Sequence, residues 1–292
     1  MKLHTFVGWG ISLVGICGLA ACGTSDGGGD SRGQSPLAAE DEVREAAIDL
    51  QSHIHENGGY SAAAWFRQGR LPGPGWKERE IVTEGNCTSW YFEPGDETKD
   101  PSPVFVGGGD IALSGALIPP STVLRQDKGN DYPKLHGEAT LWQGGEDINI
   151  ATAGHPGGVG PFKAVLKAPS HITLSKPIWD HAGLTIDRAQ DLGLEWTSSG
   201  WSVGTVKVRI EAMEAGSRSG TSVRCAFPVY SGAGVVSTRV LKHLPHPSDA
   251  WIQIEADAED TVTVSPWNVR VRLHSAGTLP NGQSSQGSVT FK

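Results

Sequence analysis

The chain has 292 residues and a formal net charge of −8 at pH 7, with 39 glycines, 18 prolines and four cysteines. This acidic balance argues against a nucleic-acid partner, because surfaces that bind nucleic acids are strongly basic. Glycine makes up about 13% of the chain (39 of 292) against a usual ~7%, which favours many short strands and turns over helix bundles. The length allows one large domain or two small ones.

The first 21 residues have the pattern of a secretory leader. A short n-region containing Lys2 precedes an apolar run that is too short and too rich in glycine for a membrane-spanning helix, which needs roughly 20 apolar residues. The run ends in Leu19-Ala20-Ala21-Cys22, which resembles the lipobox of bacterial lipoproteins. The resemblance implies that residues 1–21 are a signal peptide and that Cys22 becomes the lipidated first residue, with palmitate as an expected acyl chain. An ordinary signal peptide with an unmodified Cys22 is the alternative.

Residues 22–36 are the predicted tether. Between Gly23 and Ser35 the side chains are small or polar, which is typical of a flexible linker. A lipid-anchored domain needs such a linker to stand away from the bilayer. The resemblance to lipoproteins also implies the outer membrane, because Gly23 stands where an Asp would signal retention in the inner membrane.

Residues 37–75 are predicted to be a helical segment, in which residues 60–70 fit either a second short helix or a strand. Within it, residues 38–56 have apolar side chains at helical spacing and acidic residues in the first turn, where the helix dipole favours negative charge. Asn57-Gly58-Gly59 would end this helix. The stripe consists of Val43, Ala46, Ala47, Leu50 and Ile54.

Strand patterns dominate the rest of the chain. Val206, Val208 and Ile210 alternate with charged residues, and Val269, Val271 and Leu273 do the same. Apolar and polar residues that alternate between Gly- and Pro-rich turns are typical of antiparallel sheets packed as a sandwich. The expected fold is mainly β, with a β-domain over residues 76–168 and a β-sandwich over residues 169–292.

Two resemblances refine this fold class. Residues 172–227 resemble an Ig-like or fibronectin III-like module, through Leu192-Gly193-Leu194-Glu195-Trp196, a turn and a following strand. Together with the lipobox, segments such as "GGGDIALSG", "LWQGGEDINI" and "CAFPVYSGAGVV" resemble uncharacterised envelope lipoproteins of myxobacteria. These motifs are strand patterns, so they imply one or two Ig-like β-sandwich units and say little about activity.

The cysteines indicate one disulfide. Cys17 leaves with the leader, Cys22 is the predicted lipid site, and Cys87 and Cys225 remain. Two remaining cysteines in an oxidising compartment most simply pair with each other. Two buried free thiols are the alternative.

Several motifs suggest chemistry, each with a plain structural explanation. Residues 200–204 match G-x-S-x-G, but strands on both sides predict a hairpin turn around Ser202 and not the strand–turn–helix of a nucleophile elbow. His53 with His55, and His243 with His246, are histidine pairs that lack a convincing set of metal ligands. The acidic runs Asp257-Ala258-Glu259-Asp260 and Glu93–Asp100 are expected to be solvated turns.

Tryptophan is abundant, with ten in the chain. Trp142 and Trp196 lie on alternating strands and are expected in the core. Trp179, Trp201 and Trp267 lie in predicted loops and are candidate ligand-binding residues, because exposed aromatic rings can stack on sugars. We expect them to be buried or scattered and not to share one surface, because loops of a sandwich divide between its two ends.

The sequence therefore favours an outer-membrane-anchored lipoprotein that acts as a non-catalytic binding or structural component of the cell envelope. Its expected partners are the membrane, through the lipid on Cys22, and a protein or polysaccharide of the envelope. No cofactor, metal or nucleic acid is expected. The alternatives are a glycan-binding module that uses the loop tryptophans, and a hydrolase built on Ser202 or on an acidic pair.

Overall fold

The structure is a computed structural model that describes residues 44–53, 59–68, 76–95, 104–180 and 183–292. They all belong to one unit, residues 41–292. The predicted signal peptide, the tether and Cys22 lie outside the described residues. The unit is mainly β and its sheets pack face to face, which confirms the predicted β-sandwich class.

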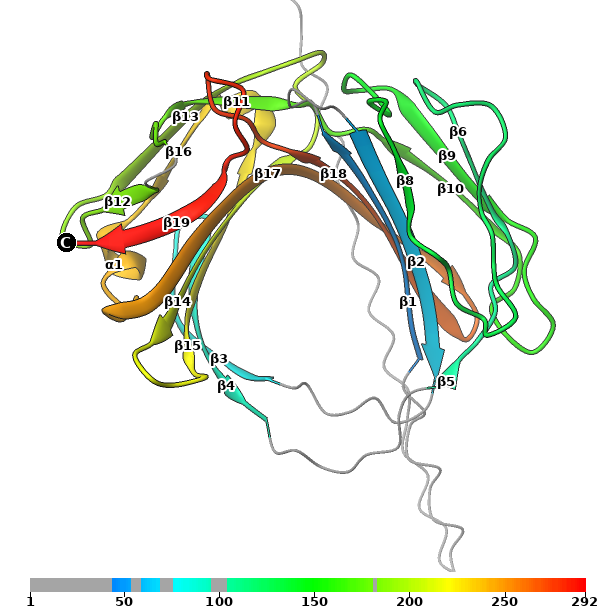
Figure 1. Cartoon of the computed structure of the whole chain (residues 1–292), viewed down its shortest axis with the longest axis horizontal. Coiled ribbons are helices and arrows are strands. Elements are labelled where there is room, and N and C mark those ends of the chain that lie inside the picture. Colours follow the sequence, from blue (N-terminus) through cyan, green and yellow to red (C-terminus); the bar gives the residue numbers. More distant parts are fainter. Residues whose placement is uncertain (1–43, 54–58, 69–75, 96–103, 181–182) are drawn as a thin grey trace, which may run out of the picture. The chain divides into compact units, whose positions relative to one another are not determined.

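A bent 12-stranded sheet runs through the unit (Figure 1). Its main path is β3-β4-β15-β14-β17-β18-β1-β2-β5, while β8 pairs with β2 and β19 pairs with β17 and β12. Pairing is antiparallel except for β1 with β18 and β12 with β19, which are parallel. The strands are β1 Arg44–His53, β2 Gly59–Gln68, β3 Trp76–Glu84, β4 Cys87–Pro94, β5 Val104–Phe105, β8 Leu135–Gly137, β12 Leu184–Ile186, β14 Thr205–Glu214, β15 Gly220–Pro228, β17 Pro247–Val264, β18 Trp267–Ala276 and β19 Gln286–Phe291.

Two smaller antiparallel sheets lie on the convex face of this long sheet (Figure 1). One has the order β10-β9-β6-β7 and the other β11-β13-β16. Their strands are β6 Ile111–Ser114, β7 Thr122–Leu124, β9 Asp147–Thr152, β10 Phe162–Lys167, β11 Ile172–Lys176, β13 Leu192–Ser198 and β16 Ala233–Val236.

Each small sheet encloses its own hydrophobic core against the long sheet. The first core contains Ile48 of β1 and Ile150 of β9, and the second contains Val208 of β14 and Leu174 of β11. Trp142 and Trp196 are buried in these cores, as predicted. The helices of the described residues are short, namely the 3-10 turn η1 Val229–Ser231 and α1 Thr238–Leu241. Within the described ranges, no helix has the length and apolar character needed to cross a membrane.

The predicted helix over residues 38–56 is wrong for its central part, because residues 44–53 form β1. Ala46, Ile48 and Leu50 also repeat with period two, and all three are buried in the first core. The strand pairs along most of its length with β18 on one side and β2 on the other. These pairings outweigh the helical propensity of its Ala, Glu and Leu residues, since tertiary context commonly overrides local propensity. Residues 59–68, in the same predicted helical segment of residues 37–75, form β2.

The long sheet also crosses the predicted boundary between residues 168 and 169. Strands β3 and β4, from the expected first β-domain, pair onward to β15, from the expected second one. In the other direction, β18 contributes Val269, Val271 and Leu273 to the core beneath β9 and β10. The described strands therefore form two cores on one shared sheet.

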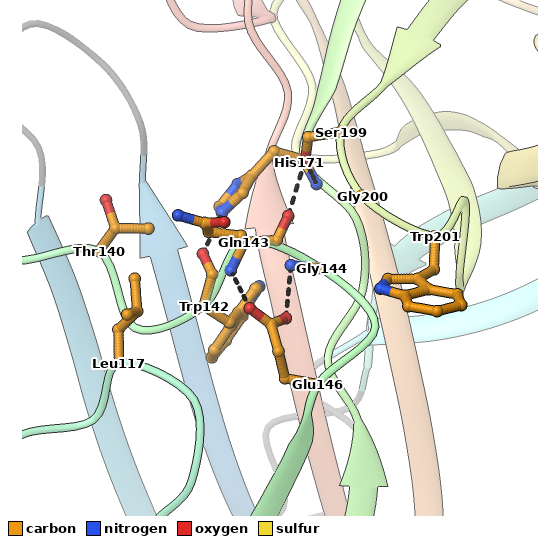
Figure 2. A pocket seen from close by; sticks show the side chains of 10 residues that line it. All are labelled: Leu117, Thr140, Trp142, Gln143, Gly144, Glu146, His171, Ser199, Gly200 and Trp201. Carbon is orange, nitrogen blue, oxygen red and sulfur yellow. Dashed lines mark hydrogen bonds between the residues drawn. The ribbon is translucent and has the colours of Figure 1, made fainter.

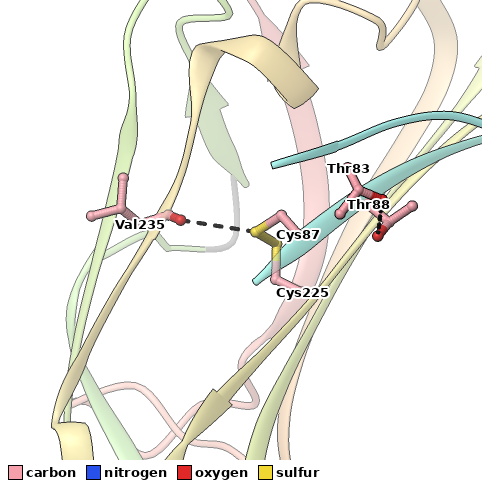
Figure 3. Close-up of a disulfide and its surroundings, with 5 residues drawn as sticks. All are labelled: Thr83, Cys87, Thr88, Cys225 and Val235. Carbon is pink, nitrogen blue, oxygen red and sulfur yellow. Dashed lines mark hydrogen bonds between the residues drawn. A yellow bond between two sulfur atoms is a disulfide. The ribbon is translucent and has the colours of Figure 1, made fainter. Parts of the chain in front are cut away.

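The predicted disulfide between Cys87 and Cys225 is confirmed (Figure 3). The two residues are direct partners across β4 and β15, with Cα atoms 4.0 Å apart, and both are buried in the second core. The Cys87 Sγ atom lies 3.8 Å from the carbonyl oxygen of Val235 in β16. The bond therefore joins two strands of the long sheet just beneath the small sheet β11-β13-β16.

Candidate binding surface

The concave face of the long sheet is a polar surface made by strict alternation. On β14, Val206, Val208 and Ile210 enter the second core, so Lys207, Arg209 and Glu211 lie on the opposite side of the sheet. The same alternation applies to β17, β18 and β1 (Figure 1). We define the concave face by the residues that these four strands direct away from the cores: Ala47, Asp49, Gln51, Lys207, Arg209, Glu211, Gln253, Glu255, Asp257, Glu259, Arg270, Arg272 and His274.

A pocket of about 660 Å³ lies on this face. Its walls come from β4, β15, β14, β17 and β18, so it spans five neighbouring strands. Basic residues outnumber acidic ones in its lining by six to two. The basic residues are Lys207, Arg209, Arg224, Arg270, Arg272 and His274, and the acidic residues are Glu255 and Glu259.

His274 lies between two carboxylates at the edge of this pocket. Its Nε2 atom is 2.9 Å from Oδ1 of Asp49, and its Nδ1 atom is 3.1 Å from Oε2 of Glu255. Burial alone would lower the pKa of His274, but the hydrogen bonds and negative charges of these two partners raise that pKa to about 9. His274 is therefore a cation at neutral pH, in which Nδ1 donates a hydrogen bond to Glu255 and Nε2 forms an ion pair with Asp49.

Arg272 extends this charge network to the next carboxylates. Its Nε atom donates to Oδ1 of Asp257 at 2.6 Å, and its Nη2 atom forms an ion pair with Glu255. Lys207 forms an ion pair with Asp257 and lies 3.5 Å from Glu259. Asp257 and Glu255 are only 2% and 7% exposed, so these cations neutralise buried negative charges. Removing one member would leave an unpaired charge, which is strongly destabilising in a buried site.

The acidic run that begins at Asp257 is not the solvated turn that the sequence predicts. It lies inside β17, where the strand alternation places Glu255, Asp257 and Glu259 on the concave face. A glycosidase would need one such carboxyl group protonated as a general acid, with a raised pKa. The pKa of Glu255 is lowered instead, because the hydrogen bonds and charges of His274 and Arg272 outweigh its burial. This arrangement holds Glu255 as a carboxylate.

Two arginines of the pocket lie over aromatic rings. The Arg224 guanidinium is 5.8 Å from the ring centroid of Trp90, and the Arg209 guanidinium is 5.2 Å from that of Trp251. Each arginine also pairs with a carboxylate, Arg224 with Glu78 at 3.0 Å and Arg209 with Glu211. The stacking fixes the planes of the two guanidinium groups, since an arginine over a tryptophan face is attracted by the ring electrons.

The three candidate tryptophans do not share a surface. Trp179 and Trp267 are 6% and 2% exposed and belong to the second and the first core, respectively. Trp267 is also the first residue of β18, not a loop residue. Trp201 is 81% exposed. A sugar platform built from all three rings is therefore not formed, which agrees with the expectation that they are buried or scattered.

Trp201 borders a second hollow of about 480 Å³ (Figure 2). Its indole packs on the backbone of Gly145, where an added Cβ would meet the ring at 2.6 Å. On the opposite side, Glu146 accepts the backbone N–H groups of Gln143 and Gly144 at 2.9 and 2.6 Å. This hollow therefore combines one exposed aromatic ring with a fixed carboxylate.

His171 is the buried titratable group of this hollow. It is 3% exposed, and its Nε2 atom lies 2.8 Å from the carbonyl oxygen of Trp142. Burial lowers the pKa of His171, so the ring is neutral at pH 7. A carbonyl oxygen only accepts hydrogen bonds, so Nε2 bears the proton and Nδ1 is an acceptor. Nδ1 is buried and has no hydrogen-bond partner among the described residues.

The G-x-S-x-G segment lies between two strands, as predicted, but the turn is not a hairpin. Strand β13 belongs to the sheet β11-β13-β16 and β14 to the long sheet, so residues 199–204 cross from one sheet to the other. Ser202 has a positive φ of 54°, and its hydroxyl is hydrogen bonded to that of Ser198 at 2.8 Å. A strand follows where a nucleophile elbow requires a helix.

The histidine pairs lie elsewhere. His243 and His246 follow α1, and Nε2 of His246 is 2.6 Å from Nη2 of Arg188. His53 ends β1, while His55 lies outside the described residues. The described ranges contain no cluster of three or more His, Cys, Asp or Glu side chains arranged to hold a metal ion.

Sequence reasoning identified the charged sides of β14 and β18 but not the surface that they form together. The signal was the alternation of Lys207 and Arg209 on one strand and of Arg270, Arg272 and His274 on another. The strand order makes these residues neighbours through β17. No protein-family model matches the chain, and no curated protein sequence matches it.

Proposed function

We propose that this protein is a lipid-anchored component of the bacterial outer membrane that binds an envelope partner on its concave face and has no catalytic role. The observation that carries the binding part of the proposal is the basic pocket of about 660 Å³ on that face. Pockets that gather a few convergent charged groups are the usual sites of ligand binding.

The anchor and the compartment rest on the sequence. Leu19-Ala20-Ala21-Cys22 supplies the lipobox-like site, and the polar residues 22–36 supply a linker between lipid and domain. The disulfide of Cys87 and Cys225 supports an oxidising compartment, since disulfides persist there and are rare in the cytosol. These features together favour a location in the cell envelope.

A non-catalytic role is favoured by the state of the candidate catalytic groups. Ser202 lies in a strand-to-strand crossing with its hydroxyl bonded to Ser198. The carboxylates of β17 are paired with Lys207, Arg272 and His274. Because Glu255 is held as a carboxylate, it does not supply the protonated general acid that a glycosidase requires.

A photo-crosslinking experiment in living cells tests the binding surface. A photoreactive amino acid at Thr88, which lines the pocket, should crosslink to an envelope component. The matched control is the same amino acid at Lys163, an exposed position on β10 of the small sheet. Equal crosslinking at both positions, or none at Thr88, would contradict the proposal.

The hollow at Trp201 is a second candidate, and one observation favours it. Trp201 is 81% exposed although its indole is held against Gly145. A large aromatic ring fixed in an exposed position suits stacking on a sugar ring. If this hollow binds sugars, Trp201→Ala should abolish a ligand-dependent change in tryptophan fluorescence that Trp90→Phe preserves.

A further inference from the structure

We infer that the concave face binds an acidic polysaccharide, with Arg270 at the centre of a groove that follows the strand order from β4 to β2. This inference deepens the proposed function by naming the chemical class of the partner. Three features support it: the basic side chains of the pocket wall, the exposed Arg270 among them, and the length of the hollowed surface.

The sign of the pocket wall is opposite to that of the whole protein. The chain has a formal net charge of −8, yet six basic residues and two acidic ones line the pocket. Asp257 and Glu255, the second of which also lines the pocket, are only 2% and 7% exposed, and both are paired with Arg272, Lys207 or His274. Carboxylates therefore balance most of the lining cations, including Arg209 and Arg224, so the positive charge with which an anionic ligand can pair is that of Arg270.

Arg270 is the cation of the pocket wall whose guanidinium can still form hydrogen bonds with a ligand. It is exposed, and no hydrogen bond or ion pair joins its side chain to another residue in the described part of the chain, although its charge acts electrostatically on Asp49. The other arginines of the wall are already paired: Arg209 with Glu211, Arg224 with Glu78, and Arg272 with Asp257. A guanidinium without a carboxylate partner is available to bind a carboxylate or sulfate through two parallel hydrogen bonds.

Arg270 also joins the pocket to a second one. A hollow of about 270 Å³ on its other side is lined by β1, β2 and β18, with Trp65 and Ala47 in its wall. The two hollows share Arg270, so the groove extends from β4 across β15, β14, β17, β18 and β1 to β2. Six strand spacings of about 4.8 Å span roughly 29 Å, which is the length of a chain and not of a single small molecule.

The shape and the side chains of this groove favour a polysaccharide over other polyanions. A concave surface cannot lie flat on a bilayer, which disfavours anionic lipid headgroups (Figure 1). Trp90, Trp251 and Trp65 lie along the same face, and aromatic rings of this kind pack against sugar rings.

Calorimetric titration of the full-length protein in detergent tests the inference. The probes are polygalacturonate, which bears carboxylates, dextran sulfate, which bears sulfates, and neutral dextran. We expect at least one acidic polymer to bind, with the tighter one identifying the anionic group, and binding should weaken as salt is added. Arg270→Ala should weaken it about tenfold or more, and Arg270→Glu further, since hydrogen bonds between charged groups are stronger than those between neutral groups.

The matched control is Arg125→Ala, because Arg125 is also an exposed arginine and follows β7 in the small sheet. It should leave binding unchanged. Four results would overturn the inference: no binding of either acidic polymer, equal binding of neutral dextran, tighter binding of single-stranded poly(dT), or binding that depends on Trp201 and not on Arg270. The membrane attachment expected from Cys22 does not depend on this titration, so failure here is distinguishable from failure of the anchor.

Discussion

Asp49 and His274 join the first strand of the described chain to one of the last. Oδ1 of Asp49 lies 2.9 Å from Nε2 of His274 across the parallel strands β1 and β18. Glu255 of β17 contacts the other ring nitrogen, so one imidazolium links three neighbouring strands at the base of the concave face. Stability should therefore depend on the protonation of this single ring.

The unfolding free energy should fall as pH rises from about 6.5 to 9. The pKa of His274 is about 9 in the folded protein and about 6.5 when unfolded, so its contribution is complete below pH 6.5 and is lost as pH passes 9. The shift corresponds to about 3 kcal/mol at most. Urea unfolding at pH 6.5 and 9 measures it.

The control for this pH dependence is His274→Gln. This variant should be less stable than the wild type at pH 6.5, and its unfolding free energy should not change between pH 6.5 and 9. His171 and His243 do not interfere, because their pKa values are lowered and they titrate below pH 6.5. At acidic pH the lowered pKa values of Asp49 and Glu255 act in the opposite direction, so stability is lost again as these groups are protonated. A wild-type protein equally stable at pH 6.5 and 9 would refute the role of His274.

Reducing the disulfide should destabilise the protein. Cys87 and Cys225 are 138 residues apart, and opening a loop of this length costs roughly 4–5 kcal/mol in the chain-entropy description, often less in practice. Denaturant unfolding with and without a reductant gives the difference. The unfolding free energy of the double variant Cys87→Ala/Cys225→Ala should not change when a reductant is added. A wild-type protein that is equally stable with and without the reductant would show that the disulfide adds nothing to stability.

Two tryptophans that look alike in the sequence should differ sharply when mutated. Trp267→Ala should cost about 3–5 kcal/mol, because its side chain is 2% exposed in the first core. Trp201→Ala should change stability by no more than about 0.5 kcal/mol, because its ring is 81% exposed. Thermal and denaturant unfolding of both variants would test this, and similar losses would contradict the assignment of Trp267 to the core.

Cys22→Ala should release the protein from the membrane fraction. The tether of residues 22–36 has no large apolar side chain that could replace the lipid. Fractionation after a salt wash separates lipid anchoring from electrostatic adhesion. Ser25→Ala, a change in the same segment that leaves the cysteine in place, is the control. A Cys22→Ala protein that still sediments with washed membranes would contradict the lipobox assignment.

The sequence predicts this fold well where neighbours in sequence decide the structure. The alternation at Val206, Val208 and Ile210 correctly indicates a strand and its buried side. It fails at residues 44–53, because Ala46, Ile48 and Leu50 fit both a helical stripe and a strand face. The choice is made by β18, which lies at the other end of the described chain. Local pattern contains no information about that distant partner.

For the candidate site, too, local pattern predicts single strands but not the neighbours that they acquire in the fold. Single strands reveal their charged sides, as with Arg270, Arg272 and His274 on β18. The order in which β4, β15, β14, β17 and β18 stand side by side is a long-range property, and it alone brings these residues together with Lys207 and Arg224. The charges of the acidic run that begins at Asp257 suggest a solvent-exposed turn, whereas the partners of Asp257 lie on neighbouring strands.

The parallel pairing of β1 with β18 has a consequence for biogenesis. As the chain emerges with its N-terminus first, β1 has no partner on that side until the segment Trp267–Ala276 has followed it. Contacts this far apart in sequence are slow to form, and an unpaired strand edge invites pairing with other chains. We therefore expect the newly made protein to remain open and dependent on holding factors until its last strands are available, and truncations just before residue 267 to accumulate as aggregates and not as shorter folded forms.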